Sequence, residues 1–201
     1  NGHVDHYYSK DLEFDGISSK LTTYGTIDEC SNTAISCHGT GVSGLVAADR
    51  DGDSSIAGVA PNAKLIIADF SPNNINYISA SNVANALNSA SNAVAVNNSW
   101  GYNASLIDED IAYMNTRGWD EYELLTNYLY YFGSTSTSDA SIASLKPYAV
   151  NFISALNDFQ NHGVVVFSNS NTDTNDNAEI TAALPELFPE LSEAFIGVVN
   201  V

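Results

Sequence analysis

The stretch CHGTGVSGLVAA, residues 37–48, and the stretch GVAPNAKL, residues 58–65, decide the fold of this chain. The first places His38 at the start of a helix of small residues, with helical spacing to its end. Three of these residues are glycines, Gly39, Gly41 and Gly44. They leave one face of the helix start bare, so that backbone can pack closely and an imidazole can project into a cleft. The alternative for a single histidine before an apolar run is a core or capping role.

Strands and helices alternate along the rest of the chain. Apolar runs predict strands over residues 64–70, 93–98, 163–167 and 195–201. Helical spacing predicts helices over residues 78–91, 104–115 and 139–161, the last containing Pro147. Loops and short strands are expected over residues 1–37, a Tyr-rich stretch of no assigned type over 119–132, and a loop over the Ser/Thr cluster 134–138. This alternation favours an α/β fold, a doubly wound parallel sheet with helices on both faces, and one domain or part of one.

Three segments are expected at the carboxyl ends of the strands, where ligands of such sheets bind. They are the start of the His38 helix, the segment 98–101 and the segment 168–171. These segments lie far apart in the sequence, so their convergence is a test of any shared function.

The two opening stretches, with the patterns H-G-T-x-V-x-G and G-V-A-P-x-A-x-L, resemble the histidine segment of the subtilisin-like serine peptidases (subtilases). The resemblance implies a subtilisin-like fold, a Ser-His-Asp triad and a polypeptide substrate. It gives His38 the role of general base, which takes the proton of the serine. The second histidine of the family pattern H-G-T-H is Gly41 here, a departure beside the base and not at it.

The stretch VNNSWG, residues 96–101, is similar to the family segment V-x-N-x-S-[LW]-G. In the family this segment runs beside the substrate as an extended edge and pairs with the peptide backbone. The resemblance therefore implies that Ser99, Trp100 and Gly101 bind substrate, with the glycine permitting backbone to approach backbone. The alternative is an ordinary strand end with a packed tryptophan.

The stretch GVVVFSNSN, residues 163–171, is similar to the family segment G-[VI]-x-V-[VF]-x-x-A-G-N. The resemblance implies that Asn171 donates its amide to the oxyanion and that Ser168, Asn169 and Ser170 wall the specificity pocket. Asn169-Ser170 replaces the small Ala-Gly pair of the family, which narrows the pocket floor or makes it more polar. The alternative for Asn171 is a turn residue in an Asn/Asp-rich loop.

Two members of the triad are not found within the chain. The serine motif G-T-S-x-[AS]-x-P is absent, and the nearest string, residues 133–137, has no proline and is interpreted as a loop. Asn1-Gly2 fits the end of the aspartate motif D-[STN]-G, which puts the aspartate one residue upstream, with Asp5 as the alternative. Residues 1–201 are thus expected to be a partial, incomplete peptidase domain, without the aspartate strand and the serine-bearing helix.

The segment 182–201 is similar to the corresponding segment of the autotransporter-type subtilases.

These gaps carry two expectations about the chain by itself. It should be inactive, and it should associate through core surface left exposed. The alternative from another class is a non-catalytic α/β binding module, or a degenerate peptidase that kept the cleft and lost the chemistry.

Charge and composition restrict the partners. The 24 acidic and 6 basic residues give a net charge of -18, which argues against nucleic acid and anionic membranes as partners. The sequence contains no apolar run of about 18 residues or more, so no membrane-spanning segment is predicted. Cys30 and Cys37 flank a short polar loop beside His38, and we expect a disulfide and a secreted or cell-surface protein, with two free cytosolic thiols as the alternative.

Acidic residues also suggest metal sites. Asp49, Asp51 and Asp53 alternate like the first ligands of a calcium loop, but no bidentate glutamate follows, so a solvated acidic turn is favoured over structural calcium. Asp173 and Asp176 form a second, weaker candidate. The reaction implied by the resemblance requires no cofactor. His3, His6 and His162 show no metal-ligand spacing and are expected at the surface.

Overall fold

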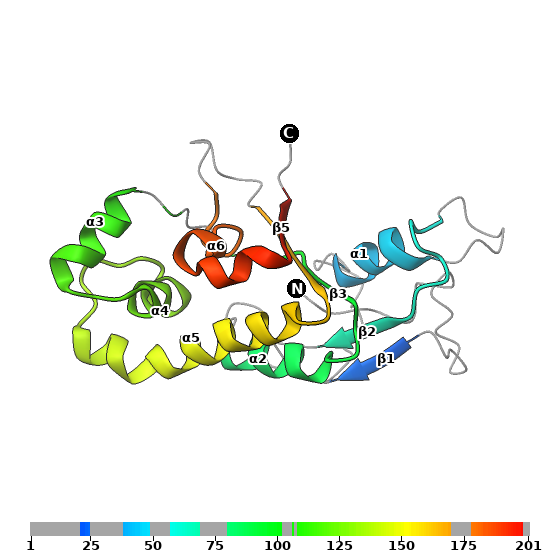
Figure 1. Ribbon diagram of the computed structural model, residues 1–201, viewed down its shortest axis with the longest axis horizontal. Coiled ribbons are helices and arrows are strands. Elements are labelled where there is room, and N and C mark those ends of the chain that lie inside the picture. Colours follow the sequence, from blue (N-terminus) through cyan, green and yellow to red (C-terminus); the bar gives the residue numbers. More distant parts are fainter. Residues whose placement is uncertain are drawn as a thin grey trace, which may run out of the picture. The chain divides into compact units, whose positions relative to one another are not determined.

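The computed structural model describes residues 21–24, 38–48, 57–68, 80–101, 106, 108–169 and 178–198 (Figure 1). The chain divides into two compact units, Asn1–Tyr77 and Ile78–Val201. We call them the N-terminal and the C-terminal unit and describe each by itself.

The N-terminal unit contains a parallel pair of strands and one helix. Strand β1 (Leu21–Tyr24) pairs with β2 (Leu65–Ala68), with Leu21 opposite Leu65. Helix α1 (His38–Ala47) lies between them in the sequence. The predicted helix at residues 38–48 and the predicted strand at 64–70 are therefore confirmed within their described parts.

The segment after α1 closes the end of this helix. The N–H groups of Gly58, Val59 and Ala60 donate to carbonyls in the last turn of α1 and just beyond it, at 2.8–3.0 Å. The acceptors are the carbonyls of Ala48, Leu45 and Val46, respectively. A helix leaves its last carbonyls without partners inside the helix, so these bonds supply what the end of α1 lacks.

Gly58 is the residue that allows this approach. A Cβ atom at position 58 would lie 2.5 Å from the backbone nitrogens of Ala47 and Ala48. In the described part of the chain, a Cβ at Gly41 or Gly44 would meet nothing within 4 Å. The close backbone packing that the sequence suggested for the glycines inside the helix is thus found at the glycine of the following segment.

The C-terminal unit is built on a parallel sheet in the order β3-β4-β5. Its strands are β3 (Ala95–Asn98), β4 (Val164–Ser168) and β5 (Phe195–Val198). The described helices are α2 (Ala80–Ser89), α3 (Asp108–Arg117), α4 (Glu121–Tyr131), α5 (Asp139–Gln160), α6 (Leu184–Leu187) and a 3₁₀ helix (Pro189–Glu193). Parallel strands joined through helices confirm the predicted α/β class.

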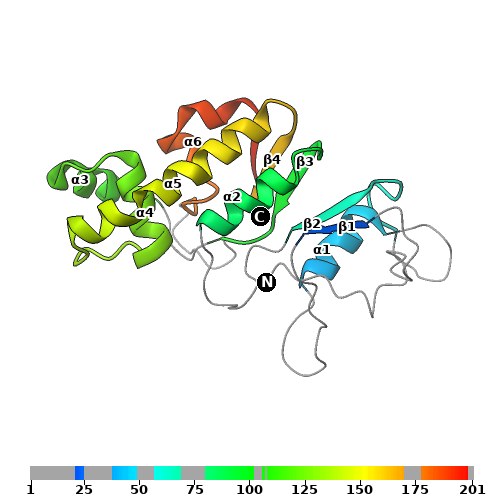
Figure 2. The same ribbon diagram turned by 90° about the horizontal axis from the view of Figure 1, so that it is seen from below.

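The core of this unit lies between its helices and β4. Helices α2 and α5 lie side by side in both views (Figures 1 and 2). Leu87 of α2 and Phe152 and Leu156 of α5 are buried. Along β4, Val165 and Phe167 are fully buried and alternate with half-buried residues, the period expected of a strand. Helix α5 runs unbroken past Pro147.

Helix α4 lies within the Tyr-rich stretch 119–132, and a capping box explains where the helix begins. The Asp120 carboxylate accepts from the Glu123 N–H at 3.0 Å, and the Glu123 carboxylate accepts from the Asp120 N–H at 2.8 Å. Lys146 of α5 forms an ion pair with Asp120 and lies 3.8 Å from Glu123. The hydrogen bond to Asp120 raises the pKa of Lys146. The cap therefore also ties α4 to α5.

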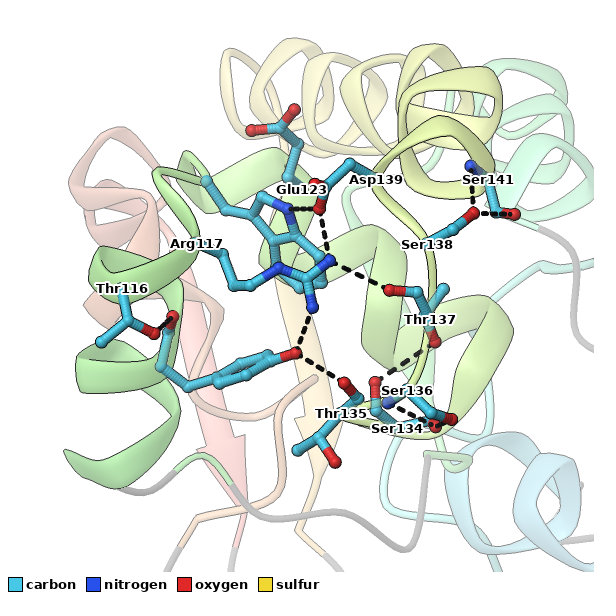
Figure 3. A network of polar contacts seen from close by, with 12 residues as sticks. Thr116, Arg117, Glu123, Ser134, Thr135, Ser136, Thr137, Ser138, Asp139 and Ser141 are labelled. Carbon is cyan, nitrogen blue, oxygen red and sulfur yellow. Dashed lines mark hydrogen bonds and ion pairs between the residues drawn. The ribbon is translucent and has the colours of Figure 1, made fainter.

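A second polar network holds α3 against the start of α5 (Figure 3). The Arg117 guanidinium forms an ion pair with Asp139 and donates to the Thr137 carbonyl at 3.0 Å and to the Tyr113 hydroxyl at 2.6 Å. It also lies over the Trp119 ring, 4.6 Å from the centroid. The Trp119 indole donates to Asp139 at 2.8 Å. Asp139 thus accepts from two donors in the first turn of α5.

This network predicts a pH-dependent contribution to stability. The hydrogen bonds from Arg117 and then from Trp119 hold the pKa of Asp139 below its ordinary value. A carboxylate with a lowered folded pKa contributes stability that is complete above its unfolded pKa and is lost as the pH falls through the folded one. We expect Asp139→Asn to lower the free energy of unfolding at pH 6 and to have little effect near pH 2, measured by urea unfolding. Asp139 is 70% exposed, so salt should weaken the effect.

The matched control for this experiment is Asp158→Asn. Asp158 is an exposed carboxylate near the C-terminal end of the same helix, where the helix dipole does not favour negative charge. Its removal should not lower stability at either pH. Equal losses in Asp139→Asn at pH 6 and pH 2 would contradict the role of the ionised carboxylate.

Candidate active site

Helix α1 of the N-terminal unit begins at His38. The residue stands where the sequence places it, at a helix N-terminus after the Cys37 position. Within the same helix, Ser43 is buried, whereas Leu45 is exposed. The role of His38 as general base stays a prediction.

In the C-terminal unit, two of the segments singled out by sequence follow neighbouring strands. Asn98 of β3 stands opposite Phe167 of β4, so the segment 99–101 and Ser168-Asn169 leave the sheet at the same edge. The Ser168 hydroxyl donates to the Asn98 carbonyl at 3.4 Å. Parallel strands bring their carboxyl ends together, which is where α/β sheets bind ligands.

Trp100 is held by its own sheet. Its indole N–H donates to the side-chain oxygen of Asn98 at 3.2 Å, and its ring packs edge-on against buried Phe167, with centroids 5.3 Å apart. The Asn98 amide in turn donates to the Val166 carbonyl at 3.2 Å. These contacts fix the ring against the sheet, and the role of residues 99–101 in substrate binding stays a prediction. Gly101 is exposed.

Asn169 has a structural partner. Its side-chain oxygen accepts from the Glu179 N–H at 2.6 Å, and its own N–H donates to the Val198 carbonyl at 2.7 Å. The Glu179 side chain is 3% exposed and accepts from the Thr181 hydroxyl at 3.1 Å. A Cβ atom at Gly101 would overlap the Glu179 carboxylate, which supplies all three of the nearest atoms. Glu179 therefore touches both segments at this edge.

The sequence interpretation missed Glu179. The sequence shows only a single acidic residue just after the Asn/Asp-rich stretch, and the structure shows that this residue, like Ile180 and Thr181 after it, is buried. Acidic residues are seldom fully buried without partners, so this burial makes Glu179 a candidate functional residue.

Several predicted residues lie outside the described residues. They are Asn171 and Ser170, the cysteines Cys30 and Cys37, the acidic positions Asp49, Asp51, Asp53, Asp173 and Asp176, Asp5, and the histidines His3 and His6. His162 is exposed, as expected, and its ring lies 4.9 Å from that of Phe159. The string 133–137 is irregular, as expected of a loop.

The comparison with protein families decides the relationship. The model of the subtilase family (peptidase S8) matches residues 3–201, which is nearly the whole chain. The chain belongs to the subtilase family. The resemblance carried by the His38 stretch is thereby confirmed at the level of the family. No curated protein and no solved structure gives a significant match.

Two further observations apply to the described part of this subtilase. Its side chains include no group of three or more His, Cys, Asp or Glu residues placed to hold a metal ion. None of its described helices is long and apolar enough to cross a membrane.

Proposed function

We propose that this subtilase is a serine endopeptidase whose natural polypeptide completes the triad with an aspartate and a serine outside residues 1–201. The family match over residues 3–201 carries the proposal. The start of α1 at His38 and the shared edge of β3 and β4 support it. The substrate is a polypeptide, and the reaction uses no cofactor.

In the proposed mechanism, His38 takes the proton of the serine hydroxyl as its oxygen attacks the scissile carbonyl. The tetrahedral oxyanion accepts a hydrogen bond from the Asn171 amide. Such a donor stabilises the transition state by ~3 kcal/mol, a magnitude known from a member of this same family. The C–N bond then breaks, and His38 returns the proton to the leaving amine. Water hydrolyses the acyl-enzyme by the same steps. The segment 99–101 holds the substrate backbone meanwhile.

The catalytic proposal is tested with the natural full-length polypeptide and with residues 1–201 alone. The full-length protein should hydrolyse a chromogenic peptide and react covalently with a serine-directed phosphonate. Residues 1–201 alone should do neither, because they lack the motif G-T-S-x-[AS]-x-P, and a triad without its nucleophile retains at best ~10³–10⁴-fold over water.

Each outcome distinguishes the alternatives. A full-length protein that neither hydrolyses peptide nor reacts with the phosphonate would favour the non-catalytic binding module. Robust turnover by residues 1–201, blocked by the phosphonate, would place the nucleophile inside this chain.

The same preparation of residues 1–201 should self-associate, since Val94, Ile196 and Val198 expose apolar side chains on or beside the described sheet.

We further propose that the protein is exported, with Cys30 bonded to Cys37. A disulfide closing so short a loop would stabilise the fold by roughly 2.5 kcal/mol in the loop-entropy model. Thiol titration of denatured, unreduced protein should find no free thiol, and two thiols would contradict the pairing. Structural calcium at Asp49, Asp51 and Asp53 stays the less favoured alternative to a solvated turn.

A further inference from the structure

Glu179 is a buried acidic residue for which the proposed mechanism has no role. Its side chain is 3% exposed, and the neighbouring Ile180 and Thr181 are fully buried. Placing a carboxylate in such surroundings is costly unless hydrogen bonds compensate it. The Thr181 hydroxyl, at 3.1 Å, is one of its partners. A residue kept at this cost beside a predicted substrate segment calls for an explanation.

The position of the carboxylate supplies that explanation. It packs directly against the backbone of Gly101, so closely that no side chain fits there. The backbone of Glu179 is itself fixed, since its N–H donates to Asn169 at 2.6 Å and its carbonyl accepts from Ala182 and Ala183 at 2.9 and 2.8 Å. The carboxylate is therefore a rigid support, anchored to the segment after β4 and in contact with the segment after β3.

The Glu179 carboxylate contacts Gly101, the residue of the segment 99–101 that has no side chain. Trp100 is fixed by Asn98 and Phe167, and the Ser99 hydroxyl accepts from the Asn97 amide at 2.8 Å. These contacts hold side chains, whereas Gly101 has no side chain through which it could be held. A backbone that pairs with a substrate must be held in place before binding, or the ordering cost weakens the complex.

We propose that Glu179 is a positioning residue, which holds the backbone at Gly101 in the conformation that binds the substrate strand. This inference rests on the proposed function. It predicts that loss of the carboxylate weakens the binding of extended peptides and leaves the nucleophile intact.

The test uses the full-length protein and two probes. One probe is a chromogenic tetrapeptide anilide, which must pair with the segment 99–101. The other is phenylmethanesulfonyl fluoride, a small reagent that reacts with the serine and has no peptide backbone to pair. Glu179→Ala should raise KM for the peptide ~10–100-fold, while the rate of inactivation by the sulfonyl fluoride stays within about twofold of wild type. Glu179→Gln keeps the side-chain volume and an acceptor oxygen, so its KM for the peptide should lie between those of wild type and Glu179→Ala.

A double substitution tests the contact itself. Gly101→Ala should raise KM because its Cβ overlaps the Glu179 carboxylate. The double variant Gly101→Ala/Glu179→Ala should be no worse than Gly101→Ala alone, since removing the carboxylate makes room for the methyl group. Glu186→Ala, which removes an exposed glutamate of α6, is the matched control and should leave both probes unchanged.

The outcomes separate this inference from the function on which it rests. A wild-type protein inert to both probes would overturn the proposed function. An active wild type whose KM is unchanged in Glu179→Ala would overturn the positioning role alone. Equal losses with the peptide and the sulfonyl fluoride would also overturn it, because they would mean that Glu179 only maintains the fold. Additive effects of the two substitutions would show that the contact does not transmit the effect.

Discussion

Replacing His38 by alanine is expected to lower kcat of the full-length peptidase by ~10⁶-fold, a magnitude that belongs to a well-studied member of this same family and is not obtained from this structure. The reason is that the serine then has no base to take its proton, so attack depends on the small fraction of serine ionised in water. The measurement is steady-state hydrolysis of a chromogenic peptide. KM should change much less than kcat, because the imidazole acts on the transition state and contributes little to substrate binding.

The chain offers a matched histidine control. His162 is exposed and lies in the turn before β4, with its ring tilted against that of Phe159. His162→Ala should retain the wild-type kcat. Circular dichroism shows whether His38→Ala is folded, which separates a loss of catalysis from a loss of structure. A folded His38→Ala protein with wild-type turnover would remove His38 from the mechanism.

Replacing Gly58 by alanine is expected to lower the free energy of unfolding by about 2–4 kcal/mol. The added methyl group would lie 2.5 Å from the backbone nitrogens of Ala47 and Ala48. Backbone cannot move aside as a flexible side chain does, so the segment must retreat from α1. The three hydrogen bonds that close the end of the helix would lengthen or break with it. Urea unfolding followed by circular dichroism measures the loss.

Gly41→Ala is the control for this substitution. Gly41 lies inside α1, and a Cβ there would meet nothing within 4 Å in the described part of the chain. Alanine favours a helix interior over glycine by about 1 kcal/mol, so this variant should be as stable as wild type or more stable. If Gly58→Ala unfolds at the same urea concentration as Gly41→Ala, the segment after α1 does not depend on close contact with the helix.

Local patterns in the sequence were sufficient for most of the elements. Helical spacing and small residues predicted α1, α2 and α5, and apolar runs predicted β2 to β5. Helix α3 begins at Asp108, later than the predicted residue 104. Helix α4 was not predicted, because the tyrosines spread around it obscure the helical spacing of its apolar residues. The spacing of Asp120 and Glu123, which form its capping box, was nevertheless present in the sequence.

The stretch around His38 was also sufficient for the family, since a local motif needs no knowledge of distant contacts. What only the tertiary structure decided concerns atoms brought together from far apart. The sequence shows that position 58 is glycine, but only the backbone of α1 shows why no other residue fits. Likewise, 78 positions separate Gly101 from Glu179, and nothing local to either residue reveals that the carboxylate of one fills the space of the other's missing side chain. Whether a charge is buried, and what it supports, depends on the packing of the whole unit and not on the neighbours of a residue in the chain.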